Sequence, residues 1–256
     1  MYFNNISIIY YLIIGLIGLA VGKFMAWANV AYVQENETVS IRNFWKHRRE
    51  TYEKQYLTMF IIAFLYIALL YKFGIKDTFY TNLDLMKFLI LTPMLVSSFL
   101  IDLKHRIIPN RLNMTIFEIG LLFTFIYGIN NISVAKDMLL GLVTGGGIFI
   151  VITLLGGLIA GKEAMGLGDV KFMGALGLYF GVSTIAEISL LAFLIAAVIS
   201  IIVLLFRLIR KNKDEYVPFG PFLVLAAFCL IFMGDGFVFQ YFVSFCKMIS
   251  DKLLGY

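Results

Sequence analysis

The chain has 256 residues, of which 61% are hydrophobic and 14% are charged, and its net charge is +5. Soluble domains typically hold about 45–50% apolar and about 25% charged residues, so this composition excludes a water-soluble protein and indicates an integral membrane protein. The positive charge does not indicate nucleic-acid binding, because the basic residues fall between apolar segments, as they do at the flanks of membrane spans.

The apolar segments predict an all-α, polytopic membrane bundle. A helix that crosses a membrane needs about 20 mostly apolar residues, and the chain offers about eight such segments within one domain covering residues 1–256. The first apolar run lacks a preceding basic region, which favours a retained span over a cleaved signal peptide. The predicted spans, in chain order, are 6–33, 56–72, 86–102, 112–130, 138–160, 170–183, 184–206 and 218–234.

The loops between these spans predict the orientation of the protein. With the N-terminus outside, four segments face the cytoplasm, and they hold most of the 21 Lys and Arg residues. This distribution agrees with the positive-inside rule and places both termini outside. The four segments are 34–55, 102–112, 161–171 and 207–217.

Cysteine and histidine are too few for a disulfide framework or a metal site. Cys229 and Cys246 form no Cys-x-x-Cys pair, and the histidines are His47 and His105. We therefore predict no metal, and interpret both histidines as polar residues in basic loops near the membrane surface.

Acidic residues near hydrocarbon are costly and mark function by default. Asp137, Glu187 and Asp235 fall near the outer ends of spans, where helix capping or solvation explains them. Glu118 lies deeper, in MTIFEIGLL, as a candidate partner for a polar group on another helix.

Asp102 and Asp169 differ from the other acidic residues, because the topology places both at the cytoplasmic membrane boundary. Asp102 lies in FLIDLKHRIIPN, where an apolar helix meets a basic loop. Asp169 follows Gly166 and Gly168, which permit close backbone approach and unusual dihedral angles, and Lys171 could bias its ionisation.

Two carboxyl groups that converge cannot both ionise comfortably, so they share one proton. Peptide hydrolysis by an aspartic pair needs this state, in which the ionised member takes a proton from water and the protonated member polarises the peptide carbonyl. The same pair also suits a proton- or ion-coupled transporter, and the residues alone leave both interpretations open.

Four segments, in order, resemble the GxGD membrane aspartyl proteases, and specifically the type IV prepilin leader peptidases. In GKFMAWANV, Lys23 replaces a serine of the family's first-span element, and Gly234 follows the last segment. The four segments are GKFMAWANV (22–30), IDLKHRIIPN (101–110), GLGDVK (166–171) and VPFGPFLVLAA (217–227).

The resemblance implies that Asp102 and Asp169 are the catalytic aspartates and that Gly166, Gly168 and Lys171 shape the active-site turn. It implies substrates that are prepilins or pseudopilins of pilus or secretion systems, cut after a short basic leader at the cytoplasmic face of a bacterial inner membrane. Pro218 to Pro221 are expected to fix how the last span enters the membrane, because proline has a fixed backbone geometry.

Many members of this family also transfer a methyl group from S-adenosylmethionine to the new N-terminus, often with Cys-x-x-Cys motifs in the first loop. Here the loop 34–55 is short and has no cysteine, and in TYEKQYLTM Gln55 and Met59 stand where the family has glutamate and glycine. The peptidase is therefore the expected activity, and methylation stays open. A membrane scaffold with inactive aspartates is a further alternative.

Overall fold

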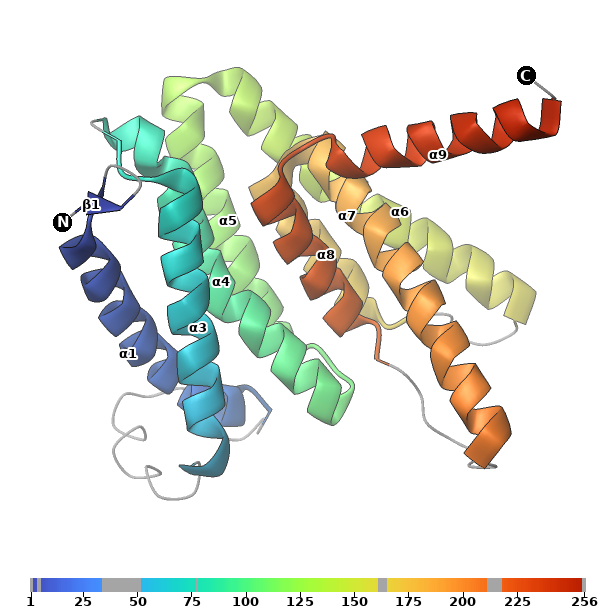
Figure 1. Ribbon diagram of the computed structural model, residues 1–256, viewed down its shortest axis with the longest axis horizontal. Coiled ribbons are helices and arrows are strands. Elements are labelled where there is room, and N and C mark those ends of the chain that lie inside the picture. The colour runs from blue at the N-terminus through green and yellow to red at the C-terminus, as the bar shows by residue number, and fades with distance from the viewer. Residues whose placement is uncertain are drawn as a thin grey trace.

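The computed structural model describes residues 2–3, 6–33, 52–76, 78–160, 165–210 and 218–254. Most of the predicted loop 34–55 lies outside the described residues, as does His47. The elements are β1 (Tyr2–Phe3), β2 (Ile6–Ser7), α1 (Ile8–Val33), α3 (Tyr52–Phe73), α4 (Phe79–His105), α5 (Asn110–Asn130), α6 (Ile132–Ala160), α7 (Leu167–Arg210), α8 (Gly220–Met233) and α9 (Phe237–Leu254) (Figure 1).

The prediction of an all-α membrane bundle is confirmed. Among the described residues, six helices are long and apolar enough to cross a membrane, and α8 is a shorter apolar helix. Each of the predicted spans coincides with one of these helices or with part of α7, apart from one or two residues at the ends of the spans 6–33 and 218–234. The short antiparallel pairing of β1 with β2, in which Tyr2 faces Ser7, was not predicted.

α7 contains two predicted spans and reverses direction between them. Its 44 residues would extend about 66 Å if straight, roughly twice the hydrocarbon thickness of a membrane. The helix breaks at Gly181, whose φ of 74° and ψ of −178° are not helical. The first half therefore corresponds to the predicted span 170–183 and the second half to 184–206.

Contacts with α6 establish the reversal. A Cβ on Gly141 would overlap Gly177, whereas one on Gly145 would meet Met173 and would lie 3.0 Å from Ile185 Cγ1. Further along α6, the ring of Phe149 stacks on Phe193, 5.6 Å away. As the residue number rises along α6, the contacted residue number falls in the first half of α7 and rises in the second half. The two halves of α7 therefore run in opposite directions.

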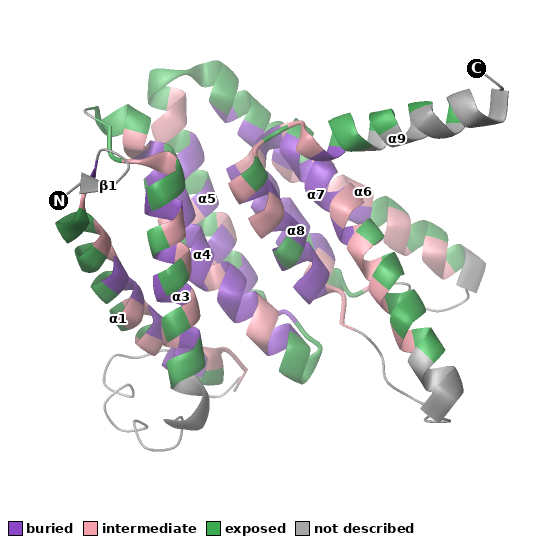
Figure 2. Cartoon of the chain, viewed as in Figure 1, coloured by how far each residue is buried: buried purple, intermediate pink, exposed green. Residues whose placement is uncertain are grey.

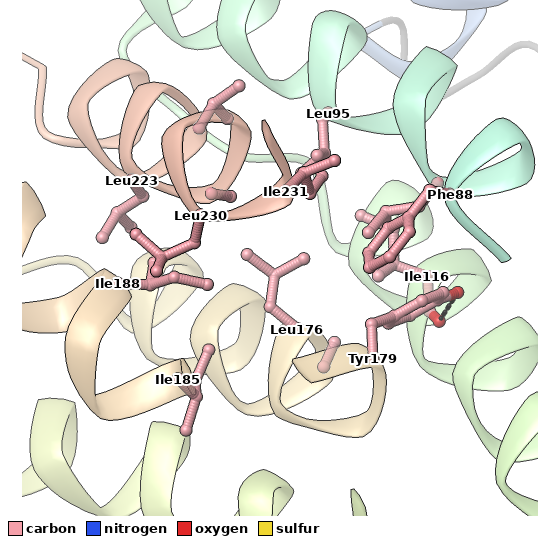
Figure 3. Close-up of a cluster of buried hydrophobic side chains, with 14 of the residues drawn as sticks. Phe88, Leu95, Ile116, Leu176, Tyr179, Ile185, Ile188, Leu223, Leu230 and Ile231 are labelled. Atoms are coloured by element: carbon pink, nitrogen blue, oxygen red, sulfur yellow. Dashed lines mark hydrogen bonds between the residues drawn. The ribbon is translucent and has the colours of Figure 1, made fainter. Parts of the chain in front are cut away.

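The core lies between α4, α5, α7 and α8. Figure 3 shows side chains of these helices converging, including Leu95, Ile116, Leu176 and Leu230. The Tyr179 hydroxyl donates a hydrogen bond to the Ile116 carbonyl oxygen at 2.8 Å, which satisfies the one polar atom of a buried side chain. Large apolar side chains cover the outer faces, as expected where a bundle meets lipid (Figure 2).

The structure differs most from the predicted spans in α4 and α9, although α6 also begins six residues before its predicted span, at Ile132. α4 begins at Phe79, seven residues before the predicted span 86–102, and includes the charged residues Asp84 and Lys87 near its start. The buried Lys87 forms an ion pair with Asp84 at 3.1 Å, and the Tyr127 hydroxyl donates to the same carboxylate at 2.7 Å. Paired charges are much cheaper to bury than isolated ones, so the helix continues through them.

α9 is the second difference, because no helix was predicted after residue 234. It follows two glycines with positive φ, Gly234 and Gly236, and projects sideways from the end of the bundle (Figure 1). Charged residues such as Lys247 and Asp251 interrupt its apolar residues, so a search for continuous apolar runs does not detect this helix.

Candidate active site

Asp102 lies in the last turn of α4 and is almost fully buried, with 4% of its surface exposed. The helix closes just after it, because the Arg106 N–H donates to the Asp102 carbonyl oxygen at 2.8 Å. Arg106 has a left-handed backbone with φ of 59°. The chain then turns towards α5, whose start is set by Pro109. The carboxylate is thus fixed at one end of the bundle.

The start of α8 holds the Asp102 side chain. The Gly220 N–H donates to Asp102 Oδ2 at 2.9 Å. A Cβ at position 220 would lie 2.5 Å from that oxygen, so only glycine permits this approach. Gly220 is the first residue of α8, and the first N–H groups of a helix have no acceptor within it, so the Gly220 N–H is free to bind Asp102.

The expectation for Pro218 to Pro221 was therefore incomplete. The segment does begin the last apolar helix, but it also contacts the first candidate aspartate directly. A glycine between two prolines at a helix start was the available signal, since such a glycine often marks a close approach. The Phe219 ring packs against Phe193 at 5.1 Å and Phe149 at 6.1 Å, which fixes this segment on α6 and α7.

Asp169 lies in the first turn of α7, where a carboxylate is favoured by the helix dipole. Its N–H donates to the Gly166 carbonyl oxygen at 3.1 Å, which closes the turn. Gly168 packs against the backbone of Ile108, 3.4 Å from the position of a Cβ. The close approach predicted for this turn is found, but neither Gly166 nor Gly168 has a positive φ.

α5 fastens this turn to the segment that follows Asp102. The buried Asn113 side-chain N–H donates to the Gly168 carbonyl oxygen at 3.0 Å. Lys171 donates to Asn110 Oδ1 at 3.0 Å. The structure therefore pairs Lys171 with α5 through Asn110, and the influence of Lys171 on the ionisation of Asp169 stays a prediction. Asn113 and Asn110 were missed, because asparagine near a helix start is usually read as a cap.

These contacts bring the two candidate aspartates together. Gly168, next to Asp169, packs against Ile108, which follows Asp102 by six residues, so both carboxylates lie at the same end of the bundle. Asp169 is partly exposed, whereas Asp102 is buried and accepts a hydrogen bond from the start of α8. An aspartic pair of this kind can hold one proton between two carboxyl groups and activate water against a peptide carbonyl.

The other acidic residues lie elsewhere. At the opposite end of the bundle, Glu187 accepts from the Gly236 N–H at 2.8 Å and the Val238 N–H at 3.1 Å, and Asp235 accepts from Thr184 at 3.0 Å. Asp137 accepts from the Val182 N–H at 3.4 Å, next to the break at Gly181.

The capping or solvated roles predicted for Asp137, Glu187 and Asp235 agree with these contacts. His105 is exposed in the last turn of α4. Within the described ranges, no three His, Cys, Asp or Glu side chains gather as a metal site would require.

Comparison with known proteins places this arrangement in a family. A sequence model of the type IV leader peptidase family matches residues 89–205, a range that contains both Asp102 and Asp169. A leader peptidase of Escherichia coli, HopD, is 36% identical over 130 residues, which cover 51% of this chain and 81% of the relative. The chain belongs to the type IV leader peptidase family.

Longer members of the family are also similar. A prepilin leader peptidase/N-methyltransferase of Aeromonas hydrophila is 31% identical over 157 residues, covering 61% of this chain and 52% of the relative. A protein of the same name from Xanthomonas campestris is 33% identical over 156 residues, covering 60% and 52%. The chain thus matches about half the length of these relatives. No solved structure gave a significant match.

Proposed function

We propose that this multi-pass membrane protein is an aspartic endopeptidase that removes the short basic leader from type IV prepilins or pseudopilins. The observation that carries the proposal is the pairing of Asp102 and Asp169 at one end of the bundle, each positioned by a second helix. Membership of the leader peptidase family supports the substrate class, since the relatives that match are named for prepilin or leader cleavage.

In the proposed reaction, the ionised member of the pair takes a proton from water while the resulting oxygen nucleophile attacks the peptide carbonyl. The protonated member donates to the carbonyl oxygen as negative charge develops there. Breakdown of the tetrahedral intermediate breaks the C–N bond, and the proton taken from water passes to the departing amine. The Gly220 N–H keeps one oxygen of Asp102 oriented throughout.

The catalytic end is assigned to the cytoplasmic side of a bacterial inner membrane. The basic residues support this orientation, because Lys104 and Arg111 flank the loop after Asp102 and both follow the positive-inside pattern. A single cysteine replacing the exposed His105, in a chain whose natural cysteines are changed to serine, tests the assignment. Labelling of intact cells by a membrane-impermeant reagent would contradict it.

The decisive experiment is cleavage of a purified prepilin in vesicles by the wild type and by Asp102→Asn and Asp169→Asn. Each change removes a carboxylate with little change in shape, so we expect cleavage to be lost in both. Lys136→Met, a change at the opposite end of the bundle, is the control. No cleavage by the wild type, combined with an ion flux that depends on Asp169, would instead support a transporter.

Methyl transfer is a separate question that the same material answers. The segment around Gln55, where the family's methyltransferase residues are expected, lies largely outside the residues whose side chains the structure describes. We propose leader cleavage without assigning methylation. Mass spectrometry of the mature pilin N-terminus, with and without S-adenosylmethionine, measures whether a methyl group is added.

A further inference from the structure

α9 starts at the level of a membrane surface, at the end of the bundle opposite to the candidate aspartates. It follows α8 after the turn 234–236. In the last turn of α3, a helix long and apolar enough to cross a membrane, Lys72 donates to the carbonyl oxygen of Ile231 in the last turn of α8. α8 therefore ends at the level where a membrane-crossing helix ends, and α9 begins there.

Two hydrogen bonds and a buried side chain fix the rotation of α9 at its start. The fully buried Glu187 of α7 accepts from the Gly236 N–H at 2.8 Å and from the Val238 N–H at 3.1 Å. The first N–H groups of a helix have no acceptor within it and carry partial positive charge, so a carboxylate is well placed there. Val238 packs into the hydrophobic core, with 6% of its surface exposed. The side of α9 that carries Val238 therefore faces the bundle.

The sequence of α9 has an apolar face and a polar face. Positions 238, 242, 245 and 249 recur at helical spacing and hold Val, Phe, Phe and Ile, which define the apolar face. Positions 240, 244, 247 and 251 recur at the same spacing and hold Gln, Ser, Lys and Asp, which define the polar face. Gln240, Ser244 and Lys247 are exposed. At about 100° per residue the two faces lie about 200° apart, so the side that faces the bundle at Val238 is the apolar one.

We propose that α9 is an interfacial helix, which lies in the plane of the membrane surface with its apolar face in lipid. Figure 1 shows α9 projecting sideways from the end of the bundle, across the direction of the membrane-crossing helices. Beyond the edge of the bundle, the side that faces the core at Val238 faces the hydrocarbon layer instead. The polar face then meets water, as it does in amphipathic helices that lie in a membrane interface.

Lipid is the partner that the residues of α9 fit. The apolar face continues the exposed apolar surface of the bundle, which a membrane protein turns toward lipid (Figure 2). Tyr241, with 64% of its surface exposed, lies between the two faces, and tyrosine is enriched where membrane meets water. The charged residues of α9 are Lys247, Asp251 and Lys252, two positive and one negative. Their charges nearly cancel, so apolar burial rather than attraction to anionic headgroups holds the helix in place.

Spin labels on single cysteines in the full-length chain, with Cys229 and Cys246 changed to serine, test the proposal in phosphatidylcholine vesicles. Collision with oxygen reports lipid, and collision with a water-soluble nickel complex reports water. Labels at Phe242→Cys and Ile249→Cys should favour oxygen at one shared depth of about 5–10 Å, whereas labels at Ser244→Cys and Lys247→Cys should favour nickel. Phe64→Cys, at an exposed position midway along α3, and Lys76→Cys, just after α3, give the hydrocarbon and water references.

A matched pair of substitutions tests the role of the apolar face. Phe245→Glu should move the label at position 249 from oxygen to nickel exposure, and Ser244→Glu should leave it unchanged. The same pattern is expected when phosphatidylglycerol is added, and a pattern that requires phosphatidylglycerol would contradict apolar insertion. Thermal unfolding checks that each variant is folded, and the single-label results decide the matter without Phe245→Glu.

Three outcomes of the single-label measurement overturn the proposal. A depth that increases steadily from position 242 to position 249 would show that α9 enters the bilayer as a span. Labels at both positions that are shielded from oxygen and from nickel would show that protein, such as a second copy of this chain, covers the apolar face. Labels at both positions that favour nickel would show that α9 lies in water.

Discussion

Gly220 is the position where the smallest change should disturb the proposed catalytic pair most. In Gly220→Ala the added Cβ would lie 2.5 Å from Asp102 Oδ2 and 3.0 Å from its Cγ, well inside van der Waals contact. The backbone does not resist the change, because Gly220 is not among the positive-φ residues. The clash therefore falls on the Asp102 side chain, which has to rotate away and lose its bond to the Gly220 N–H.

The size of the effect follows from two terms. A hydrogen bond to a charged group contributes about 1.5–3 kcal/mol, and a displacement of a reacting group by about 1 Å can cost about 100-fold in rate. We expect kcat for prepilin cleavage to fall about 100-fold while KM changes little, because the substrate-facing surface near Asp169 is unchanged. Initial rates of cleavage by protein in vesicles, measured over a range of prepilin concentrations, separate the two constants.

Gly147→Ala is the matched control, since a Cβ at this helical glycine of α6 meets no atom within 4 Å. It should cleave prepilin at the wild-type rate, and its midpoint of thermal unfolding should be equal or slightly higher. If Gly220→Ala retained more than half of the wild-type kcat, the contact between α8 and Asp102 would have no catalytic importance, and the account of the site given above would be wrong.

Three further predictions concern the supports of the site and the opposite end of the bundle. Asn113→Ala frees the Gly168 carbonyl and should lower kcat about tenfold, whereas Thr115→Val on the same helix should not; equal rates would refute a positioning role. Glu187→Leu leaves two backbone donors unpaired, which costs about 1–3 kcal/mol each. Its midpoint of thermal unfolding should therefore fall clearly, while the cleavage rate per folded molecule is unchanged. The midpoint of Glu187→Gln should fall less. Gly181→Ala places a side chain at positive φ against the Asp137 carboxylate. It should lower the midpoint of thermal unfolding by more than Gly147→Ala raises it. An unchanged midpoint would argue against the break in α7.

The apolar helices could be predicted from the sequence because burial in lipid requires long uninterrupted apolar segments. The span predicted for α4 began seven residues too late, because the search for a long apolar run did not extend back past Asp84, whose pairing with the buried Lys87 depends on the fold. α9 was missed for a similar reason. Its apolar residues are spread over one side of a helix with charged residues between them, and a search for spans does not detect that pattern.

The sequence allowed prediction of those candidate-site residues that act through an ionisable side chain. Asp102 and Asp169 were found because carboxylates at a membrane boundary are conspicuous. The contact with Gly220 was not found, because the donor is a backbone N–H that lies 118 positions away in the sequence. The hydrogen bond from Asn113 to the Gly168 carbonyl likewise depends on packing between two helices. Every residue has a backbone carbonyl, so the sequence does not indicate which one accepts this bond.

The shortness of α8 has a consequence for how water reaches the peptide bond. Its 14 residues extend about 21 Å, less than the roughly 30 Å of a bilayer's hydrocarbon layer. The first half of α7, from Leu167 to the break at Gly181, is similarly short, whereas α6 with 29 residues extends about 43 Å. The helix half that carries Asp169 and the helix that holds the Asp102 side chain are therefore each about half as long as α6. Helices shorter than the hydrocarbon layer make the surrounding bilayer thinner, so we expect water to reach the proposed scissile bond through locally thinned lipid rather than through a channel.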